Sequence, residues 1–370
     1  MKYFLIAGER SGDVYGANLI VALLKKDPAA QIVCYGGDEM KAAGGELLSH
    51  YKETAFMGFY EVFSNLRVIK KKLKTCKNQL LAFHPDAVIF IDYPGFNLRM
   101  ASFAKRQGFR TIYYISPKLW AWNKGRIKEI RSFVDELLVI FPFEVPFYKS
   151  LNYPAEYVGN PLIEHIEGYE LDTSFKRSAS HRWNIAFLPG SRKQEVENSI
   201  EMINKLAHQR KDLFLWIAGV DNVPIDLYES IIRLSNVRLV VGKTYEILNL
   251  CDVAIVTSGT ATLETALWNI PQVVCYRAHP ISYLIAKYLV KIKFISLVNL
   301  IVDKEIVKEL IQKDYTIENV LREVDLLMTD KTRRNQQLDD YRELNTLLGQ
   351  EKTSEKVAEK VYNLVTTKPL

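Results

Sequence analysis

Short runs of apolar residues alternate with longer amphipathic segments over most of the chain. Apolar runs of this length are typical of strands buried in parallel sheets. The segments between them, such as residues 16–26, repeat leucine and isoleucine at the spacing of one helical face. This alternation predicts an α/β fold built on parallel sheets. The predicted strands are residues 2–8, 31–35, 87–91, 111–115, 137–140, 184–188, 213–218, 237–241, 253–256 and 272–276.

The strand–helix pattern occurs twice, on either side of a polar stretch. Residues 164–182 have no strong apolar pattern, and we interpret them as a linker. With 370 residues, the chain exceeds the usual size of one domain. We therefore predict two doubly wound, Rossmann-like domains, residues 1–165 and 183–330, followed by C-terminal helices at residues 331–370.

Two strand ends in the second half have the makeup of phosphate-binding loops. Ser258-Gly259-Thr260-Ala261 follows a buried strand and opens a helix, so its backbone N–H groups lie at the positive end of the helix dipole. Ordinary helix caps have the same composition, so this pattern alone leaves both readings open. Glu264 falls one turn further along, within reach of a ribose hydroxyl. In the other loop Ser191 precedes Arg192, whose guanidinium suits bidentate phosphate binding.

The first half carries carboxylates at comparable strand ends. Asp92 follows the predicted strand 87–91 and precedes Pro94 and Gly95. It is either a helix cap or a site residue, because ligands gather at the carboxyl ends of strands in open α/β sheets. The loop Gly8-Glu9-Arg10-Ser11-Gly12-Asp13 follows the first strand in the same way. Its spacing is not Gly-x-Gly-x-x-Gly, so the dinucleotide fingerprint is absent.

Positive charge is concentrated in the first half of the chain. Residues 1–165 hold 22 lysines and arginines against 16 acidic residues, which accounts for the whole formal net charge of +6. The densest basic run, within residues 67–77, extends a segment that has apolar residues at helical spacing. This segment, 55–77, is either a core helix with a solvated lysine end or a helix that docks on an anionic bilayer. No nucleic-acid-binding motif accompanies the charge, so we expect no nucleic acid partner.

Cysteine usage and hydropathy predict a cytoplasmic protein. The cysteines, at positions 34, 76, 251 and 275, are widely spaced, as is typical of reduced thiols. The apolar start at residues 1–7 ends too early for a signal peptide, and no stretch reaches the length of a transmembrane helix. Neither an Asp-x-Asp pair nor a His/Cys cluster with metal-ligand spacing occurs. We therefore expect no metal and no cofactor.

Five sequence strings occur along the chain in a distinctive order. They are Gly8-Glu9-Arg10-Ser11-Gly12-Asp13, Ser116-Pro117-Lys118-Leu119-Trp120-Ala121-Trp122, Val158-Gly159-Asn160-Pro161-Leu162, Leu188-Pro189-Gly190-Ser191-Arg192 and Ser258-Gly259-Thr260-Ala261-Thr262-Leu263-Glu264. Together they resemble the lipid-A-disaccharide synthase family from residue 3 to about residue 301. The resemblance implies a GT-B fold, in which two Rossmann-like domains face a cleft. The chain departs from the family pattern at Tyr93 and Gly95, next to Asp92.

The resemblance also implies a reaction and a set of site residues. The family transfers 2,3-diacylglucosamine from UDP-2,3-diacylglucosamine to 2,3-diacylglucosamine 1-phosphate with inversion, which yields the β-1,6-linked lipid A disaccharide 1-phosphate and UDP. Asp92 is then the candidate general base for the acceptor hydroxyl, with Glu9 and Asp13 in reserve. The implied substrate-binding residues are Gly8, Ser11, Gly12, Ser191, Arg192, Ser258, Gly259, Thr260, Ala261, Glu264 and Asn299.

Anionic, acylated substrates imply peripheral association with the inner leaflet of the inner membrane. The C-terminal helices are expected to pack back on the first domain or on a partner chain, and the latter would produce a homodimer. Two alternatives remain at this point. One is another UDP-sugar enzyme of the same fold, such as a lipid II-type transferase or a UDP-N-acetylglucosamine 2-epimerase. The other is a non-catalytic nucleotide-sugar-binding protein, which would bind UDP yet tolerate the loss of Asp92.

Overall fold

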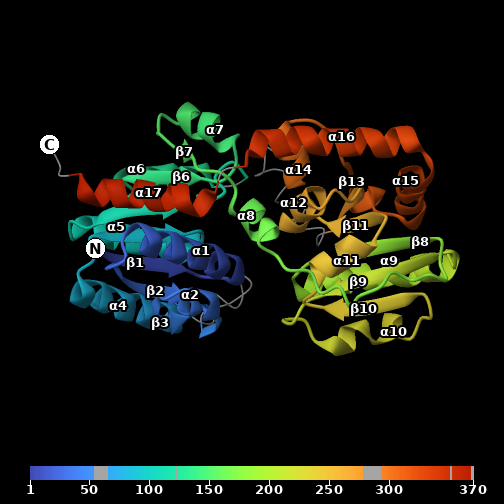
Figure 1. Ribbon diagram of the computed structural model, residues 1–370, viewed down its shortest axis with the longest axis horizontal. Coiled ribbons are helices and arrows are strands. Elements are labelled where there is room, and N and C mark those ends of the chain that lie inside the picture. The colour runs from blue at the N-terminus through green and yellow to red at the C-terminus, as the bar shows by residue number, and fades with distance from the viewer. Residues whose placement is uncertain (54–65, 122, 278–292, 351, 368–370) are drawn as a thin grey trace. The chain divides into compact units, whose positions relative to one another are not determined.

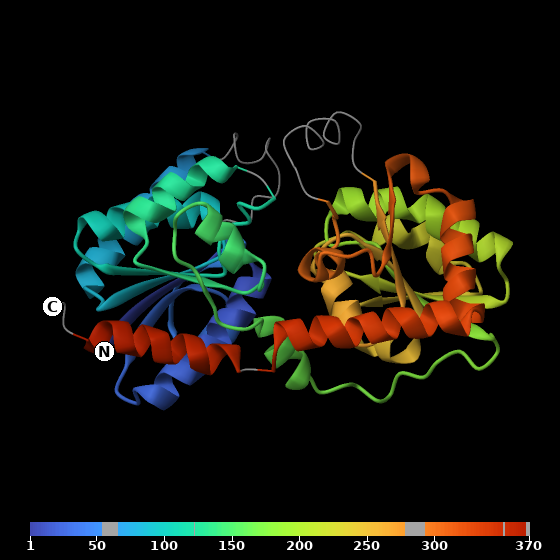
Figure 2. The same ribbon diagram turned by 90° about the horizontal axis from the view of Figure 1, so that it is seen from above.

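The computed structural model describes residues 1–53, 66–121, 123–277, 293–350 and 352–367, and these form two compact units. Unit 1 comprises Met1–Glu167 and Leu348–Leu370, and unit 2 comprises Gly168–Leu347 (Figure 1). Each unit has its own parallel sheet with helices packed on both faces (Figure 2). The predicted α/β class with two doubly wound sheets is confirmed.

Seven strands form the sheet of unit 1. They are β1 (Lys2–Ala7), β2 (Gln31–Gly36), β3 (Glu46–His50), β4 (Ala87–Ile91), β5 (Arg110–Tyr114), β6 (Glu136–Val139) and β7 (Glu156–Tyr157). Their order is β3-β2-β1-β4-β5-β6-β7, and all pairings are parallel. Because β1 pairs with both β2 and β4, the strand order reverses there, and the carboxyl ends of β1 and β4 form the switch point where ligands bind in such sheets.

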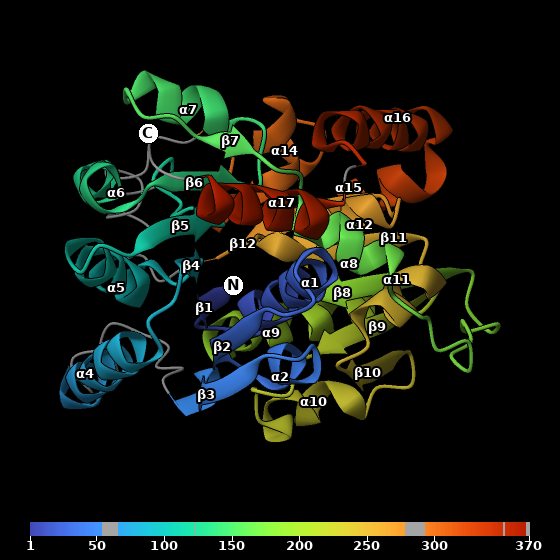
Figure 3. The same cartoon turned by 60° about the vertical axis from the view of Figure 1, so that its left-hand side comes forward.

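Helices cover both faces of this sheet. They are α1 (Arg10–Lys26), α2 (Asp38–Ala42), α4 (Leu66–Phe83), α5 (Pro94–Arg106), α6 (Ile127–Phe133), α7 (Glu144–Ser150), α8 (Pro161–Glu167) and α17 (Thr353–Thr366). Helices α4, α5 and α6 lie side by side on one face (Figure 3), where Cys76, Met100 and Ile130 belong to the same apolar core as Phe4 and Phe90. Helices α1 and α17 pack together on the other face.

Unit 2 repeats this plan with six strands. They are β8 (Trp183–Leu188), β9 (Leu213–Gly219), β10 (Val237–Val241), β11 (Val253–Thr257), β12 (Gln272–Tyr276) and β13 (Lys308–Ile311). The order β10-β9-β8-β11-β12-β13 places the switch point between β8 and β11. The helices are α9 (Lys193–Gln209), α10 (Glu229–Ile232), α11 (Thr244–Leu250), α12 (Thr260–Leu267), α14 (Leu297–Val302), α15 (Ile317–Thr329) and α16 (Lys331–Leu348). Both switch points therefore carry loops that are predicted from the sequence to hold site residues.

The predicted strands are all observed, each with both ends within one residue of the prediction. Three further strands, β3, β7 and β13, were missed. Each lies at the edge of its sheet, and its residues are mostly only partly buried. An edge strand needs no continuous apolar run, so the hydropathy pattern did not reveal it.

The C-terminal segment, predicted as one set of helices at residues 331–370, divides between the two units. In unit 2, the side chain of Gln337 on α16 accepts the Gln272 amide of β12 at 2.7 Å. In unit 1, α17 buries Val357 and Val361 and forms an ion pair from Glu355 to Lys25 of α1 at 2.9 Å. Among the described residues, no helix is long and apolar enough to cross a membrane.

Candidate functional site

The backbone after β4 adopts an unusual conformation at Asp92. Asp92 and Tyr93 have positive φ angles of 46° and 48°, in the left-handed region that side chains with a Cβ rarely adopt. The Asp92 carbonyl accepts hydrogen bonds from Asn97 Nδ2 and from the Tyr113 hydroxyl, both at 2.8 Å. Strained residues persist where the surroundings over-determine them, and such positions cluster at functional sites. These contacts therefore hold Asp92 in one place.

Tyr93 explains the glycine that ends the strand next to it. A Cβ atom placed on Gly8 would lie 2.1 Å from Cγ of the Tyr93 ring. Any side chain at position 8 would therefore clash with this ring, and only glycine fits. The ring also stacks on Phe96, with centroids 5.5 Å apart. Gly8 thus allows the segments that follow β1 and β4 to pack closely. The Tyr93 ring, at a position where the chain departs from the family pattern, fills the space beside Gly8.

The Asp92 carboxyl group lies in a mixed electrostatic environment. It is partly buried. Burial and then the negative charge of Glu9 raise the pKa of Asp92 to about 6, while the Lys118 ammonium and a backbone hydrogen bond act in the opposite direction. Such a carboxyl group is a stronger base than an ordinary aspartate. A perturbed pKa of this kind at a strand end is typical of an acid–base residue.

The two reserve candidates for the base occupy different environments. Glu9 is exposed, accepts a hydrogen bond from the Ser11 hydroxyl at 3.0 Å and acts electrostatically on Asp92. Asp13 is buried, with 2% of its surface exposed. Its carboxylate accepts three backbone N–H groups at the start of α2, namely those of Gly37 at 2.6 Å, Glu39 at 3.2 Å and Met40 at 3.1 Å. This geometry favours a capping role for Asp13 and leaves Glu9 as the partner of Asp92.

In unit 2, the loop before α9 presents a guanidinium. The Glu195 side chain folds back to accept the amides of Ser191 at 3.0 Å and Arg192 at 3.2 Å, and it pairs with Arg192 Nη1 at 3.2 Å. Gly190, with a φ of 104°, makes room because a Cβ there would lie 2.4 Å from Glu195 Oε2. The Arg192 side chain remains 71% exposed. Its cation, rather than the already occupied amides, is therefore the group that this loop offers to an anion.

The second loop, between β11 and α12, offers backbone amides instead. Helix α12 begins at Thr260, and its N-cap Gly259 supplies no side-chain acceptor. Ser258 anchors the loop, because its amide donates to the Cys275 carbonyl at 3.1 Å and its hydroxyl to the Ile295 carbonyl at 2.9 Å. The first-turn amides of α12, including that of Ala261, lie at the positive end of the helix dipole, which favours an anion.

Glu264 lies one turn into α12, as predicted, and is only partly exposed. Burial raises its pKa, while a hydrogen bond from the Tyr245 hydroxyl, at 3.2 Å, acts the other way. The Tyr245 ring in turn lies against Trp268, with centroids 5.4 Å apart. The Tyr245 hydroxyl thus orients the carboxylate, which suits a group that binds a ligand hydroxyl.

Asn299 differs from the prediction that it binds substrate. It is completely buried, and its side chain is fully used inside unit 2. Nδ2 donates to the Val307 carbonyl and to Glu309 Oε1, both at 2.9 Å, while Oδ1 accepts the amides of Ile306 and Val307. Its partners lie seven to ten residues further along the chain. The geometry supports a role in holding the segment that receives the Ser258 hydroxyl, and not a direct contact with a ligand.

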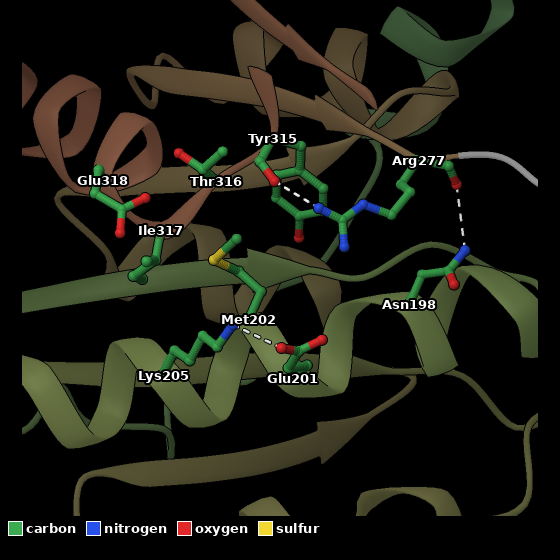
Figure 4. A pocket seen from close by; sticks show the side chains of 9 residues that line it. All are labelled: Asn198, Glu201, Met202, Lys205, Arg277, Tyr315, Thr316, Ile317 and Glu318. Carbon is green, nitrogen blue, oxygen red and sulfur yellow. Dashed lines mark hydrogen bonds and ion pairs between the residues drawn. The ribbon is translucent and has the colours of Figure 1, made fainter. Parts of the chain in front are cut away.

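A separate cavity of about 220 Å³ lies between α9 and the start of α15 (Figure 4). Arg277 at its mouth donates to the Tyr315 carbonyl at 2.7 Å, and Lys205 pairs with Glu201 at 2.6 Å. None of the predicted donor residues lines it. The complete lining is Asn198, Glu201, Met202, Lys205, Arg277, Tyr315, Thr316, Ile317 and Glu318. Neither of the two loops contributes a residue to this cavity, so it is distinct from the phosphate site that they suggest.

Comparison with known proteins identifies relatives over nearly the whole chain. A family model described as lipid-A-disaccharide synthetase matches residues 3–361. A lipid-A-disaccharide synthase from Geobacter metallireducens is 35% identical over 347 residues, which cover 90% of each chain. One from Coxiella burnetii is 32% identical over 369 residues and 98% of each chain.

Solved structures with the same fold are more distant in sequence. A UDP-GlcNAc 2-epimerase from Neisseria meningitidis, bound to UDP-GlcNAc, matches with a TM-score of 0.69 at 13% identity and covers 98% of this chain and 100% of its own. The glycotransferase of kitacinnamycin matches with a TM-score of 0.67 at 14% identity, with 98% and 99% covered. At these identities the likeness concerns the fold alone.

Proposed function

Because the chain belongs to the lipid-A-disaccharide synthetase family, we propose that it carries out that family's glycosyl transfer. The donor is UDP-2,3-diacylglucosamine, the acceptor is 2,3-diacylglucosamine 1-phosphate, and the products are the β-1,6-linked disaccharide 1-phosphate and UDP. The observation that carries the proposal is the extent of the family match, which runs from residue 3 to residue 361 and so takes in both sheets.

Asp92 is the general base in this proposal. Its carboxylate takes the proton of the acceptor's 6-hydroxyl while that oxygen bonds to the anomeric carbon and the bond from this carbon to the diphosphate breaks. Attack from the face opposite the leaving group inverts the anomeric configuration. A base works best when its pKa lies near the working pH, and a pKa of about 6 keeps Asp92 ionised yet basic at neutral pH. The negative charge of Glu9 supports this role.

The donor side neutralises the leaving diphosphate. We assign this task to the exposed Arg192 guanidinium and to the α12 amides beginning with Gly259, because groups positioned where charge develops stabilise a transition state without reorganising. Glu264 is assigned to a ribose hydroxyl, and Ser258 to the support of the loop. Gly8, Ser11 and Gly12 shape the acceptor loop. Every step of this scheme uses side chains and amides of the chain itself.

The basic run of the first half supports binding to an anionic membrane surface. On α4 the side chains of Arg67, Lys70, Lys71 and Lys74 are exposed, and Val68 is 44% exposed among them. Lys72 is not part of this surface, since it turns inward to the His50 carbonyl and to Glu53. The apolar residues of 54–65, which belonged to the same prediction, lie outside the described residues. We propose that the exposed α4 cations place the enzyme at the inner leaflet.

The decisive experiment incubates purified protein with UDP-2,3-diacylglucosamine and 2,3-diacylglucosamine 1-phosphate in buffer containing EDTA, and detects the disaccharide by mass spectrometry. Wild type is expected to form the disaccharide and UDP in equal amounts, and Asp92→Asn to form almost none. UDP binding without any product would favour a nucleotide-sugar-binding protein. Conversion of UDP-N-acetylglucosamine to its 2-epimer would favour an epimerase. Either result would overturn the proposal.

A further inference from the structure

A buried carboxylate in unit 1 joins two loops beside Asp92. Glu144, the first residue of α7, is 1% exposed. One of its oxygens, Oε2, accepts the backbone amides of Ile140 at 3.2 Å and Phe141 at 3.0 Å. The other, Oε1, accepts the Ser116 hydroxyl at 2.6 Å and the Trp120 indole N–H at 3.3 Å. A carboxylate with four donors ties the loop after β6 to the loop after β5.

The loop after β5 is built to project one side chain. Ser116, Pro117 and Leu119 are buried, whereas Lys118 between them is exposed. The Tyr148 hydroxyl of α7 donates to the Pro117 carbonyl at 3.0 Å and adds a second tie from the same helix. Just before the loop, Ile115 has a φ of 64°, an unfavourable conformation for a β-branched residue. Such a backbone needs external ties to keep its shape.

This loop is the direct neighbour of Asp92 in the sheet. Strands β4 and β5 pair in register up to Ile91 and Tyr114, and the Asp92 amide donates to the Tyr114 carbonyl at 3.2 Å. The charged groups that act on the Asp92 carboxylate are Glu9 from the loop after β1 and Lys118 from the loop after β5. Of these two, only Lys118 favours the ionised base.

We propose that Glu144 is a positioning residue, whose carboxylate holds the Ser116–Trp120 loop, which follows the strand paired with β4, so that Lys118 keeps its ammonium on the side of the sheet where Asp92 lies. The inference deepens the proposed function and rests on it, because it takes Asp92 as the base. Glu144 does not touch substrate. It acts through Lys118, which counteracts burial and Glu9 and so keeps Asp92 ionised at neutral pH.

An amide is a poor replacement for the carboxylate at position 144. Three of the four partners of Glu144 are N–H groups, which can only donate, and a glutamine has one acceptor oxygen and one NH₂ group, so the NH₂ group would face at least one of those N–H donors. Glu144→Gln keeps the size of the side chain while it disrupts one of the two loop attachments. Trp120→Phe is a milder change, since the ring that packs edge-on against Phe143 stays and only the N–H donor is lost.

The test reads the pKa of Asp92 directly by ¹³C NMR on protein labelled at aspartate carboxyl carbons, with the Asp92 signal assigned by its loss in Asp92→Asn. Lys118→Met is expected to raise this pKa by roughly half a unit to one unit, because an exposed partner is screened by solvent. Glu144→Gln is expected to raise it by a similar amount. The double variant is expected to raise it no further, since both changes remove the same interaction. Glutamate carboxyl carbons are unlabelled, so the spectrum contains no signal from Glu144 itself, whose pKa burial raises to about 7.

An unchanged Asp92 pKa in folded Glu144→Gln, or an additive shift in the double variant, would overturn the inference. Should Glu144→Gln fail to fold, as judged by its thermal melt, Trp120→Phe takes its place and must shift the pKa upward by a smaller amount. Product formation by Asp92→Asn tests the proposed function independently. If that variant remains active, Asp92 is not the base, whereas the NMR series still reports whether Glu144 positions Lys118.

Discussion

The first strand-end loop of each unit illustrates how one topology serves two kinds of chemistry. After β1, Glu9 lies at the start of α1 and its charge acts on Asp92 of the next strand. After β8, Glu195 lies in the first turn of α9 and folds back onto the amides of its own loop. The first arrangement brings two carboxylates together, and the second leaves an exposed cation, Arg192. Loops at the same place in the two sheets thus differ in the charge that they present.

The same contrast extends to the second loop at each switch point. In unit 1, β4 is followed by the strained, partly buried Asp92, whose environment raises its proton affinity. In unit 2, β11 is followed by Ser258 and Gly259, which precede the open amides of α12. A glycosyl transfer needs a proton acceptor for the attacking hydroxyl and positive potential for the departing diphosphate. In the proposed scheme the two units divide these needs, so the loss of Asp92 and the loss of Arg192 are expected to impair different ones.

The largest effect is expected from Asp92→Asn. Without a base, kcat should fall roughly 10²- to 10⁴-fold, while the KM for the UDP-sugar changes little, because the donor loops belong to unit 2. Initial rates over a range of donor concentrations measure both constants. Asp38→Asn is the matched control, since it removes an exposed carboxylate of the same unit. A fall in kcat of less than threefold for Asp92→Asn would eliminate Asp92 as the base.

The next largest effect is expected from Arg192→Ala, which tests the donor half of the comparison. Loss of the guanidinium should lower kcat/KM for the donor roughly 10²- to 10³-fold, and Arg192→Lys should restore only part of it, because an ammonium cannot bind a diphosphate bidentately. The control is Arg233→Ala, whose exposed side chain pairs with Glu229 on the same unit. Equal activity of the alanine and lysine variants would contradict a role for bidentate binding.

Charge reversal on α4 tests a further difference between the units, since the net positive charge lies in residues 1–165. The triple change of Lys70, Lys71 and Lys74 to Glu should lower partition to vesicles with anionic lipid by at least tenfold, given about 1 kcal/mol per basic residue near such a surface. Co-sedimentation at low salt measures this. The same reversal at the exposed Lys211, Lys313 and Lys331 of unit 2 is the control. Equal loss in both triples would indicate that only net charge matters.

A smaller effect is expected at Glu264. Glu264→Gln should raise the KM for the donor about tenfold, the size of one hydrogen bond to a charged group, with kcat nearly unchanged. Donors that lack one ribose hydroxyl provide the control. With the deoxy donor that lacks the bonded hydroxyl, wild type and Glu264→Gln should have the same KM. A tenfold difference that persists with both the 2′-deoxy and the 3′-deoxy donor would show that Glu264 does not bind the ribose.

Most of the fold could be predicted from the sequence, because buried parallel strands must be continuously apolar. The edge strands β3, β7 and β13 could not, since most of their residues are only partly buried. At the site, Asp92, Arg192 and Glu264 could be selected because each follows a strand or opens a helix. Glu144 was missed, since its four partners come from segments up to 28 residues away and no local pattern marks it. Only tertiary contacts distinguish such a residue from an ordinary helix-starting glutamate.

Asn299 and Asp13 present the opposite case. Both are predicted site residues, and both use their side chains inside their own unit. Asp13 caps α2, and Asn299 satisfies a turn together with Glu309. A family motif preserves the residues that hold a site as well as those that touch the ligand, and the two kinds look alike in a sequence. Counting the hydrogen bonds that each polar group already makes separates them.

The smallest expected effect is a change in pH dependence, and it tests the pair of carboxylates that distinguishes unit 1. A base must be ionised, so kcat/KM should rise with pH through the Asp92 pKa of about 6. Glu9→Gln removes the neighbouring negative charge, so the pKa of Asp92 falls. The acidic limb of the kcat/KM profile should then move to lower pH by less than one pH unit. Glu46→Gln, an exposed change in the same unit, should leave it in place. If the acidic limb of the Glu9→Gln profile stayed at the wild-type pH, the electrostatic effect of Glu9 on Asp92 would be contradicted.

The same pair has a cost in stability whose sign follows from the raised pKa. The folded-state pKa of Asp92 lies above its ordinary value of 3.8, so its protonated form favours the folded state at low pH, and that stability is lost as the pH rises from about 4 to about 6. Asp92→Asn cannot ionise and escapes this loss. Its melting temperature relative to wild type should therefore increase between pH 4 and pH 7. A constant difference would mean that Asp92 ionises as freely in the folded chain as in the unfolded one, and unit 1 would then lack the strained base that sets it apart from unit 2.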